Sequence, residues 1–349
     1  MSGKHTIGLL DPNNQLFVNA RNATLRWPQA LRAIYPLVVL IAGLIIPFLA
    51  QLVSIPVFIA ASPLIGDPMA LFTTEATSFQ GMVVLVISFA PIYLLVWLWL
   101  RFIERRPFRT IGLDTGHAAK QYGRGLLLGL LMFGSAVAVL TLLGYIEITA
   151  TDFGLAAWIG VGTILIGWIV QGAAEEVVAR GFMLPIIGAR WRPWIGVLLS
   201  SSAFGLLHLL NPNLNWLAML NLVLFGIFAA LYTLWEEGLW GIFAIHSVWN
   251  WAQGNLFGFE VSGNAFGGDS LLDLNETGPD LLTGGAFGPE GGLAVTLVLV
   301  LSCVVVWWVD RRGRARQTSA ALPEQSVYER DEADEALATD DLDGGERTL

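Results

Sequence analysis

Long apolar runs separated by short polar segments dominate this sequence of 349 residues. A helix needs about 20 mostly apolar residues to cross a bilayer, so these runs predict membrane-spanning helices. Eight runs meet or approach that length: 33–54, 80–100, 123–145, 158–180, 194–210, 216–235, 238–257 and 291–309. We therefore predict an all-α, polytopic membrane protein of about eight transmembrane helices.

Composition and charge narrow the class of protein further. Hydrophobic residues make up 55% of the chain and charged residues only 13%, against roughly 25% charged residues in soluble globular proteins. A single cysteine excludes a disulfide framework and a cysteine-based zinc or iron–sulfur site. The net charge of −9 comes mainly from residues 317–349 and does not indicate the basic face that nucleic acid requires. We expect membrane lipids around the protein and no nucleic-acid partner.

The distribution of Lys and Arg predicts an orientation, because positive charges in short loops mark the cytoplasmic side. Basic residues occur before the first run, after the second, between the fourth and fifth, and after the eighth. The alternate loops contain none: 55–79, 146–157, 211–215 and 258–290. Both termini are therefore expected in the cytoplasm, with eight crossings between them.

Ionisable side chains inside the runs are the most informative feature, because each costs about 2.5–3.5 kcal/mol at the centre of a bilayer. In the fourth run, Glu176 and Arg180 are four residues apart with the acid first, the favourable order for an ion pair on a helix. Glu175 has no basic residue three or four positions away. We infer that Arg180 neutralises Glu176, whereas Glu175 is left as a base strengthened by its apolar surroundings. The alternative is that these charges mark the solvated end of a helix.

Two further polar clusters lie inside the fifth and seventh runs. His208 follows Phe204 by one helical turn, and Asn250 follows His246 at the same spacing. The imidazole and amide of the second pair share one helical face, an arrangement suited to stabilising a developing oxyanion. The alternatives are that His208 is a packing residue and that His246 and Asn250 link neighbouring helices by hydrogen bonds.

The three clusters can meet only if the fourth helix is longer than its apolar run. His208 lies about 21 Å along the fifth run from the cytoplasmic side, at 1.5 Å per residue. Glu175 reaches that depth if the fourth helix continues to about Gly188, which places it some 20 Å from that end. This geometry also buries Arg180, which its pairing with Glu176 makes tolerable.

In this order, and on separate runs, the clusters resemble the CPBP family of intramembrane proteases, which covers CAAX prenyl endopeptidases and bacteriocin-processing (Abi) proteins. The family's pattern is EExxxR, then FxxxH, then HxxxN. Here it reads Glu175-Glu176-Val-Val-Ala-Arg180, Phe204-Gly-Leu-Leu-His208 and His246-Ser-Val-Trp-Asn250. The resemblance covers roughly residues 105–257.

The resemblance implies an endopeptidase that uses water as its nucleophile inside the membrane. Glu175 would be the general base, and His208 would help to position the water. His246 and Asn250 would form the oxyanion site. The remaining motif residues would support these four: Glu176, Arg180 and Phe204.

The resemblance leaves the use of a metal open, because both metal-dependent and metal-independent mechanisms are described for the family. The sequence lacks the HExxH spacing of the commonest zinc peptidases. Glu175, His208 and His246 are the three residues that would bind zinc if it were used, leaving a fourth position for water. We favour a mechanism without a metal or other cofactor.

On this reading the chain has six parts. They are a cytoplasmic segment 1–32, two accessory helices 33–104, a protease core 105–257, a Gly-rich acidic outer loop 258–290 that is loosely folded, a last helix 291–309, and an acidic disordered tail 310–349. The expected location is a bacterial or archaeal cell membrane, and the expected partner is a membrane-tethered or hydrophobic peptide substrate. The alternatives are a non-catalytic scaffold or immunity protein that keeps the fold, and a transporter with a Glu/His proton relay.

Overall fold

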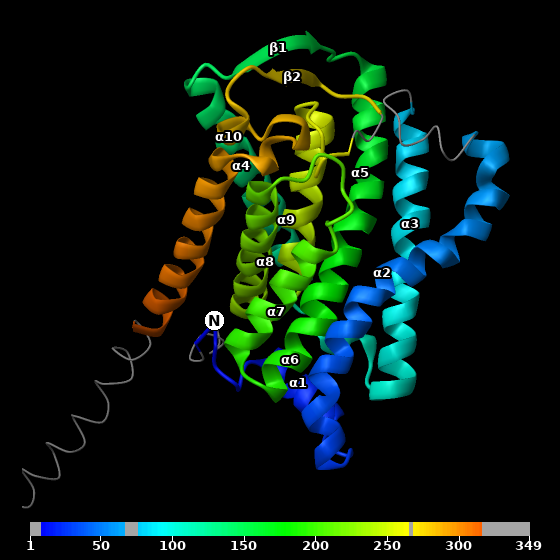
Figure 1. The fold of residues 1–349 in the computed structure, drawn as a ribbon, viewed down its shortest axis with the longest axis vertical. Helices are drawn as coiled ribbons and strands as arrows, with labels where there is room; N and C mark the ends of the chain where they lie inside the picture. Colours follow the sequence, from blue (N-terminus) through cyan, green and yellow to red (C-terminus); the bar gives the residue numbers. More distant parts are fainter. Residues whose placement is uncertain (1–7, 67–75, 265–267, 316–349) are drawn as a thin grey trace, which may run out of the picture.

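The computed structural model describes residues 8–66, 76–264 and 268–315. It is a bundle of helices that run roughly along one axis, with a two-stranded ribbon at one end (Figure 1). The α-helices and strands are α1 (Gln15–Ala23), α2 (Gln29–Ile65), α3 (Ser78–Leu98), α4 (Ala118–Leu142), β1 (Ile146–Thr151), α5 (Leu155–Glu176), α6 (Leu184–Arg190), α7 (Pro193–Leu206), α8 (Trp216–Glu236), α9 (Trp240–Trp251), β2 (Leu272–Glu276) and α10 (Asp280–Thr283). A C-terminal helix, Leu293–Ala315, completes the bundle. The predicted fold class, an all-α polytopic membrane protein, is confirmed.

Six helices among the described residues are long and apolar enough to cross a membrane. They correspond to the first, second, third, fourth, sixth and eighth predicted runs. The fifth run forms α7, which is 14 residues long and ends at Leu206 rather than near 210. The seventh forms the 12-residue α9, extended by a π-helical segment to Leu256. A total of eight crossings therefore stays a prediction.

The fourth helix continues well beyond its apolar run. A π-helical segment, η4 (Val177–Met183), joins α5 to α6 without a break, so that one helix extends from Leu155 to Arg190. A π-helix contains more residues per turn than an α-helix and often occurs at functional sites. The extension required for the polar clusters to meet is therefore present.

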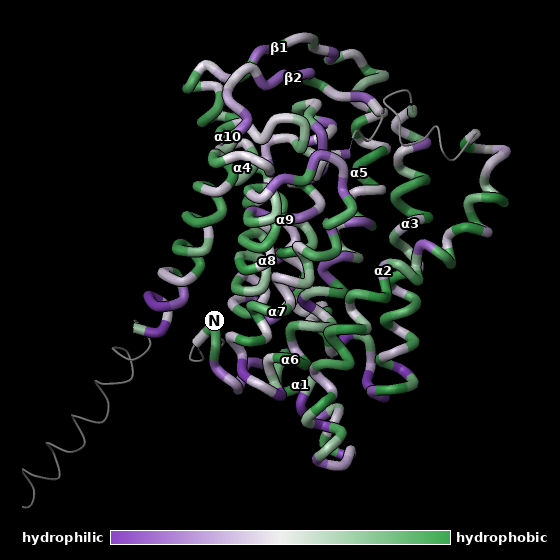
Figure 2. The backbone as a smooth tube through the Cα atoms, in the orientation of Figure 1, coloured by the Kyte–Doolittle hydropathy of each residue, from purple (hydrophilic) through white to green (hydrophobic). Residues whose placement is uncertain are grey.

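Different elements cover the two ends of the bundle, and both ends are polar (Figure 2). The β1–β2 ribbon and the loops beside it cover one end, and α1 and α6 lie at the other, which is also where the C-terminal helix ends. Polar colouring concentrates at both ends, whereas the helices between them are largely apolar. This is the distribution expected of a bundle surrounded by lipid. The direction in which it crosses the membrane stays a prediction.

The Gly-rich segment 258–290 is more ordered than its composition predicts. Its strand β2 pairs antiparallel with β1, and the α10 turn is followed by two short 3₁₀ turns. Several glycines in this segment have positive φ, among them Gly284 at 100° and Gly288 at 87°, a backbone conformation that other residues rarely adopt. The expectation of a loose loop was wrong for the described part of this segment.

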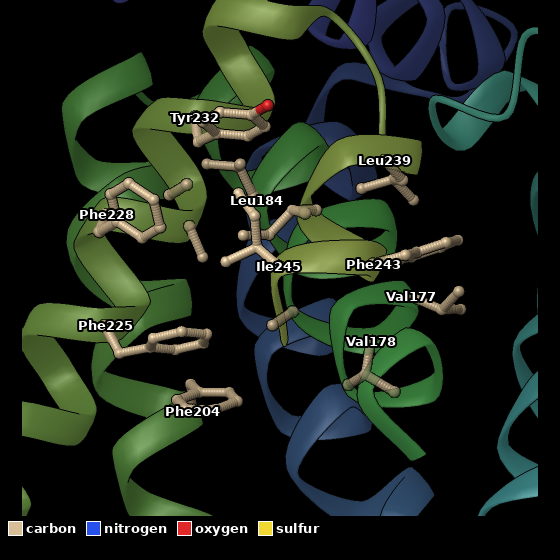
Figure 3. Packing of buried hydrophobic residues seen from close by; sticks show 14 of the residues in the cluster. Val177, Val178, Leu184, Phe204, Phe225, Phe228, Tyr232, Leu239, Phe243 and Ile245 are labelled. Atoms are coloured by element: carbon tan, nitrogen blue, oxygen red, sulfur yellow. The ribbon is translucent and has the colours of Figure 1, made fainter. Parts of the chain in front are cut away.

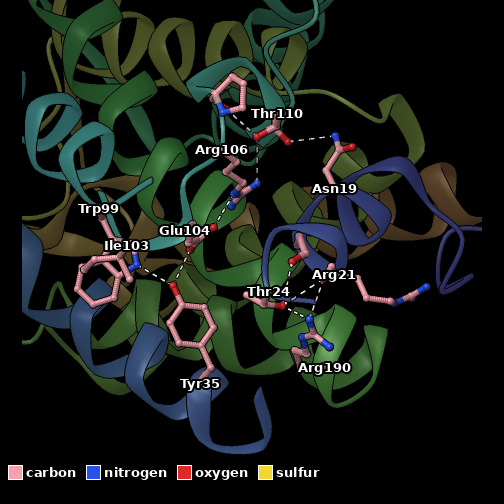
Figure 4. A network of polar contacts seen from close by, with 12 residues as sticks. Asn19, Arg21, Thr24, Tyr35, Trp99, Ile103, Glu104, Arg106, Thr110 and Arg190 are labelled. Atoms are coloured by element: carbon pink, nitrogen blue, oxygen red, sulfur yellow. Dashed lines mark hydrogen bonds and ion pairs between the residues drawn. The ribbon is translucent and has the colours of Figure 1, made fainter. Parts of the chain in front are cut away.

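The N-terminal segment is also packed against the bundle. Leu16 and Phe17 of α1 are buried. Near α1, Tyr35 donates a hydrogen bond to buried Glu104, which also forms an ion pair with Arg106 (Figure 4). The hydrogen bond from Tyr35 fixes the start of α2 to the end of the helix Ser78–Glu104. At the other terminus, the last helix reaches Ala315, beyond the predicted limit of 309. The rest of the predicted tail, 316–349, lies outside the described residues.

Candidate active site

The helix that continues through η4 carries the first cluster. Arg180 donates a hydrogen bond from Nη1 to Glu176 Oε1 at 3.1 Å, and both side chains are 0% exposed. The predicted ion pair is therefore present, deep inside the bundle. Arg180 also donates to the carbonyl of Gly226 in α8 at 3.1 Å, and its guanidinium lies 4.7 Å from the centre of the Phe204 ring. One arginine thus connects three helices.

Close contact between α5 and α9 brings the second carboxylate to the third cluster. A β-carbon added to Gly172 would lie 2.9 Å from the backbone nitrogen of Ser247, so the two helices could not approach this closely with a larger residue there. His246 lies between the glutamates: its Nδ1 is 2.8 Å from Glu176 Oε1, and its Nε2 is 3.6 Å from Glu175 Oε2. The sequence predicted Arg180 as the partner of Glu176 but not the second partner, His246.

The hydrogen bonds of the two histidines fix which nitrogen carries the proton. A carboxylate and a carbonyl oxygen can only accept. His246 Nδ1 therefore donates to Glu176, and His208 Nδ1 donates to the carbonyl of Phe204 at 2.9 Å. In a neutral ring the opposite nitrogen, Nε2, is then an acceptor. Both histidines are thus oriented by their Nδ1 contacts, and both leave Nε2 for other partners.

Aromatic rings hold these histidines in place. Phe204 packs 4.8 Å from the His208 ring and 5.9 Å from the His246 ring, measured between centroids. Phe225 of α8 contacts His246 edge to face at 5.0 Å. Figure 3 shows Phe204 and Phe225 against each other, below Phe228 and Tyr232 on α8. His208 itself lies in the turn after α7 rather than within a helix.

One cavity of about 250 Å³ brings together the four residues assigned a chemical role: Glu175, His208, His246 and Asn250. Phe204 also lines it, whereas Glu176 and Arg180 lie behind its wall. Much of the wall is apolar and comes from α2, α3, the turn after α7, α8 and the C-terminal helix: Phe48, Phe89, Leu207, Leu222, Val295 and Leu299. Phe48 is 53% exposed, so this wall of the cavity is also part of the outer surface of α2. All three polar clusters meet at one place.

The cavity is also lined by residues that sequence reasoning did not assign to the site, and two of them have hydrogen bonds to residues of the site or beside it. Gln171 donates to Glu175 Oε1 at 2.7 Å and accepts from Asn250 Nδ2 at 2.9 Å. Its position one turn before Glu175 was a usable signal. Glu290, from the Gly-rich segment, accepts hydrogen bonds from Trp249 Nε1 at 3.1 Å and from the backbone and hydroxyl of Ser262. No pattern in the sequence connects Glu290 with the helices.

The fit of a metal to this site can be judged from the side chains. Within the described part of the chain, no group of three or more His, Cys, Asp and Glu residues is arranged to hold a metal ion. His246 and Glu175 approach each other, but each also has a protein partner: Glu176 for the histidine and Gln171 for the glutamate. Glu175, His208 and His246, the residues that would bind zinc if it were used, thus share a cavity without forming such a group.

Comparison with known proteins supports the resemblance seen in the motifs. Residues 155–252 match a family described as type II CAAX prenyl endopeptidase Rce1-like. The uncharacterized protein YyaK of Bacillus subtilis is 29% identical over 149 residues, which cover 40% of this chain and 48% of YyaK. The alignment thus spans about half the length of that relative. No solved structure matches the chain. All seven predicted site residues fall within the region that is similar to the Rce1-like family.

Proposed function

We propose that the chain is an intramembrane endopeptidase that hydrolyses a peptide bond of a membrane-tethered or hydrophobic peptide. The observation that carries this proposal is the free oxygen of Glu175 in the cavity. Glu175 Oε2 is buried and, among the described residues, has no hydrogen-bond partner. It lies 3.6 Å from His246 Nε2. A buried carboxylate oxygen without a partner is energetically unfavourable, and its position in a site suggests a function.

A water molecule would complete this arrangement. Glu175 Oε2 and neutral His246 Nε2 both accept hydrogen bonds, and an oxygen about 2.8 Å from each can donate one hydrogen to each. Proton transfer from this water to Glu175 would generate the nucleophile for attack on a peptide carbonyl. Glu175 is then the general base. The proton it gains is available for the departing amine.

His208 and Asn250 provide the remaining functions. His208 lines the same cavity, and its Nε2, left free by the Nδ1 contact, would orient the attacking water or the substrate amide. Asn250 uses one Nδ2 hydrogen toward Gln171, which leaves the other for the oxyanion of the tetrahedral intermediate. The proton that Glu175 gains could pass to His246 Nε2, 3.6 Å away, which would then be a second donor to the oxyanion until the proton moves to the departing amine. Glu176 and Arg180 would hold the helix and the His246 ring.

The cavity also indicates the kind of substrate. Its apolar walls suit a hydrophobic segment, whereas the few polar groups that converge on Glu175 suit a backbone amide. Phe48 lines the cavity and is also exposed on the apolar outer surface of α2, which would place the entrance on the lipid-facing side. A peptide anchored in the membrane can therefore approach without passing through bulk water.

The test compares protein termini in membrane fractions by mass spectrometry. Cells would make equal amounts of wild type, Glu175→Ala, His208→Ala or the control Glu147→Ala, which changes an exposed glutamate of β1. We expect new termini with wild type and with Glu147→Ala, and their loss in both site variants. Identical profiles from four folded proteins would contradict proteolysis and favour the non-catalytic scaffold or immunity protein.

A further inference from the structure

Gln171 occupies a central position between the base and the oxyanion residue. It precedes Glu175 by one helical turn on α5, so both side chains project from the same face. Its side chain lines the cavity, and the residue is only 6% exposed. The three motifs described above do not include it. Its role must therefore be argued from its contacts.

Both ends of the Gln171 amide are used, each with a different partner. Nε2 donates to Glu175 Oε1 at 2.7 Å, and Oε1 accepts from Asn250 Nδ2 at 2.9 Å. A carboxylate can only accept a hydrogen bond, which determines the amide orientation: nitrogen toward Glu175 and oxygen toward Asn250. Rotating the amide by 180° would oppose two acceptors at one end and two donors at the other.

This chain of hydrogen bonds decides which oxygen of Glu175 is free. Because Oε1 accepts from Gln171, the other oxygen, Oε2, is left toward His246 without a hydrogen bond of its own. If the Gln171 donor were absent, the carboxylate could rotate about its terminal torsion, which has no sharp preferred angle. The same chain orients Asn250, so one side chain aligns both the base and an oxyanion donor.

We propose that Gln171 is a positioning residue of this site: it directs Glu175 Oε2 toward the reacting water and holds Asn250 in register with it. This inference rests on the proposed protease function. Misplacing a reacting group by about 1 Å can reduce a rate about 100-fold. Loss of Gln171 should therefore lower kcat while KM changes little, because Gln171 acts through Glu175 and Asn250 rather than by binding the substrate.

Two variants of Gln171 separate its two contacts. Gln171→Met keeps the length of the side chain and removes both hydrogen bonds. Gln171→Glu keeps an acceptor for Asn250 but replaces the donor to Glu175 by a second acceptor. The control is Gln80→Met at the start of α3, a partly buried glutamine whose amide donates to the carbonyl of Ile65, away from the cavity. Thermal unfolding in detergent would verify that each variant is folded.

The experiment measures cleavage of a quenched fluorescent peptide that carries a site found in the terminus comparison. We expect a 10- to 100-fold lower kcat for Gln171→Met and Gln171→Glu, with KM within about twofold of wild type, and unchanged values for Gln80→Met. If Glu175→Ala is inactive and both Gln171 variants cleave at the wild-type rate, the positioning role is wrong and the protease survives. If wild type and Glu175→Ala give the same termini, both proposals fail.

Discussion

The buried ion pair of Arg180 and Glu176 allows a quantitative test of how the site is held together. The perturbation is Arg180→Met, which keeps a long apolar stem and removes the charge. At 3.1 Å and an effective dielectric constant of about 20, the attraction between the two charges is about 5 kcal/mol. Both side chains are 0% exposed, so water cannot replace the lost partner. Removing one member of such a pair typically costs about 3–5 kcal/mol.

We therefore expect Arg180→Met to lower the free energy of unfolding by about 3–5 kcal/mol, and Glu176→Gln to have a similar effect because it leaves the guanidinium unpaired. The double variant removes both charges and should lie much closer to wild type than either single variant. Its glutamine can still accept from His246. The expected result is strong non-additivity, which a double-mutant cycle detects.

The assay is reversible unfolding of the purified protein in mixed micelles, followed by the fluorescence of its 14 tryptophans. The matched control is Arg314→Met, which breaks another pair with i, i+4 spacing, to Asp310, in which the arginine side chain is 40% exposed. Asp310 is only 6% exposed, but water reaches the arginine end of this pair, so the change should cost less than Arg180→Met. A double variant whose destabilisation equals the sum of the single ones would refute the reasoning, as would an Arg180→Met protein as stable as the control.

Two further predictions concern the packing of α5 against α9 and the β1–β2 ribbon. Gly172→Ala should lower both stability and cleavage rate, because its β-carbon meets the backbone of Ser247 at 2.9 Å and must separate α5 from α9; wild-type values in thermal unfolding and peptide cleavage would contradict this. Burial raises the pKa of Glu276 on β2 from 4.5 to about 7. Since the folded protein keeps this proton up to about pH 7 and the unfolded chain releases it near 4.5, stability should fall as pH rises across that interval. Glu276→Gln should reduce this loss, and Tm measured at pH 5 and pH 8 would show whether it does.

The membrane class and the grouping of the site could be read from the sequence because both depend on local patterns. Apolar runs report helices directly, and polar residues inside such runs are rare enough to be informative. The pairing of Glu176 with Arg180 followed from helical spacing alone. The extension of the fourth helix followed from depth: Glu175 could reach His208 only if the helix continued past Arg180.

Other features depend on tertiary contacts that local patterns do not encode. The contact of His246 with Glu176 requires α5 and α9 to pack closely at Gly172. The sequence does not show which helices are neighbours. Glu290 reaches the cavity from a segment whose many glycines predicted a loose loop. Glycines with positive φ also occur in ordered turns, as they do here. The fifth run was predicted too long, since its apolar character continues into the turn that holds His208 after α7 ends.

The π-helical segment Val177–Met183 determines where the long helix from Leu155 to Arg190 can lose a residue. Removing one residue there would restore an α-helix and leave the residues after it in place, whereas removing one from α6 would rotate everything after it by about 100°. Gly188, where even an added β-carbon would lie 2.3 Å from an atom of the Phe17 ring, would then give its place to a larger neighbour. Single-residue deletions between Leu184 and Gly188 should therefore be absent from functional relatives, even where substitutions accumulate.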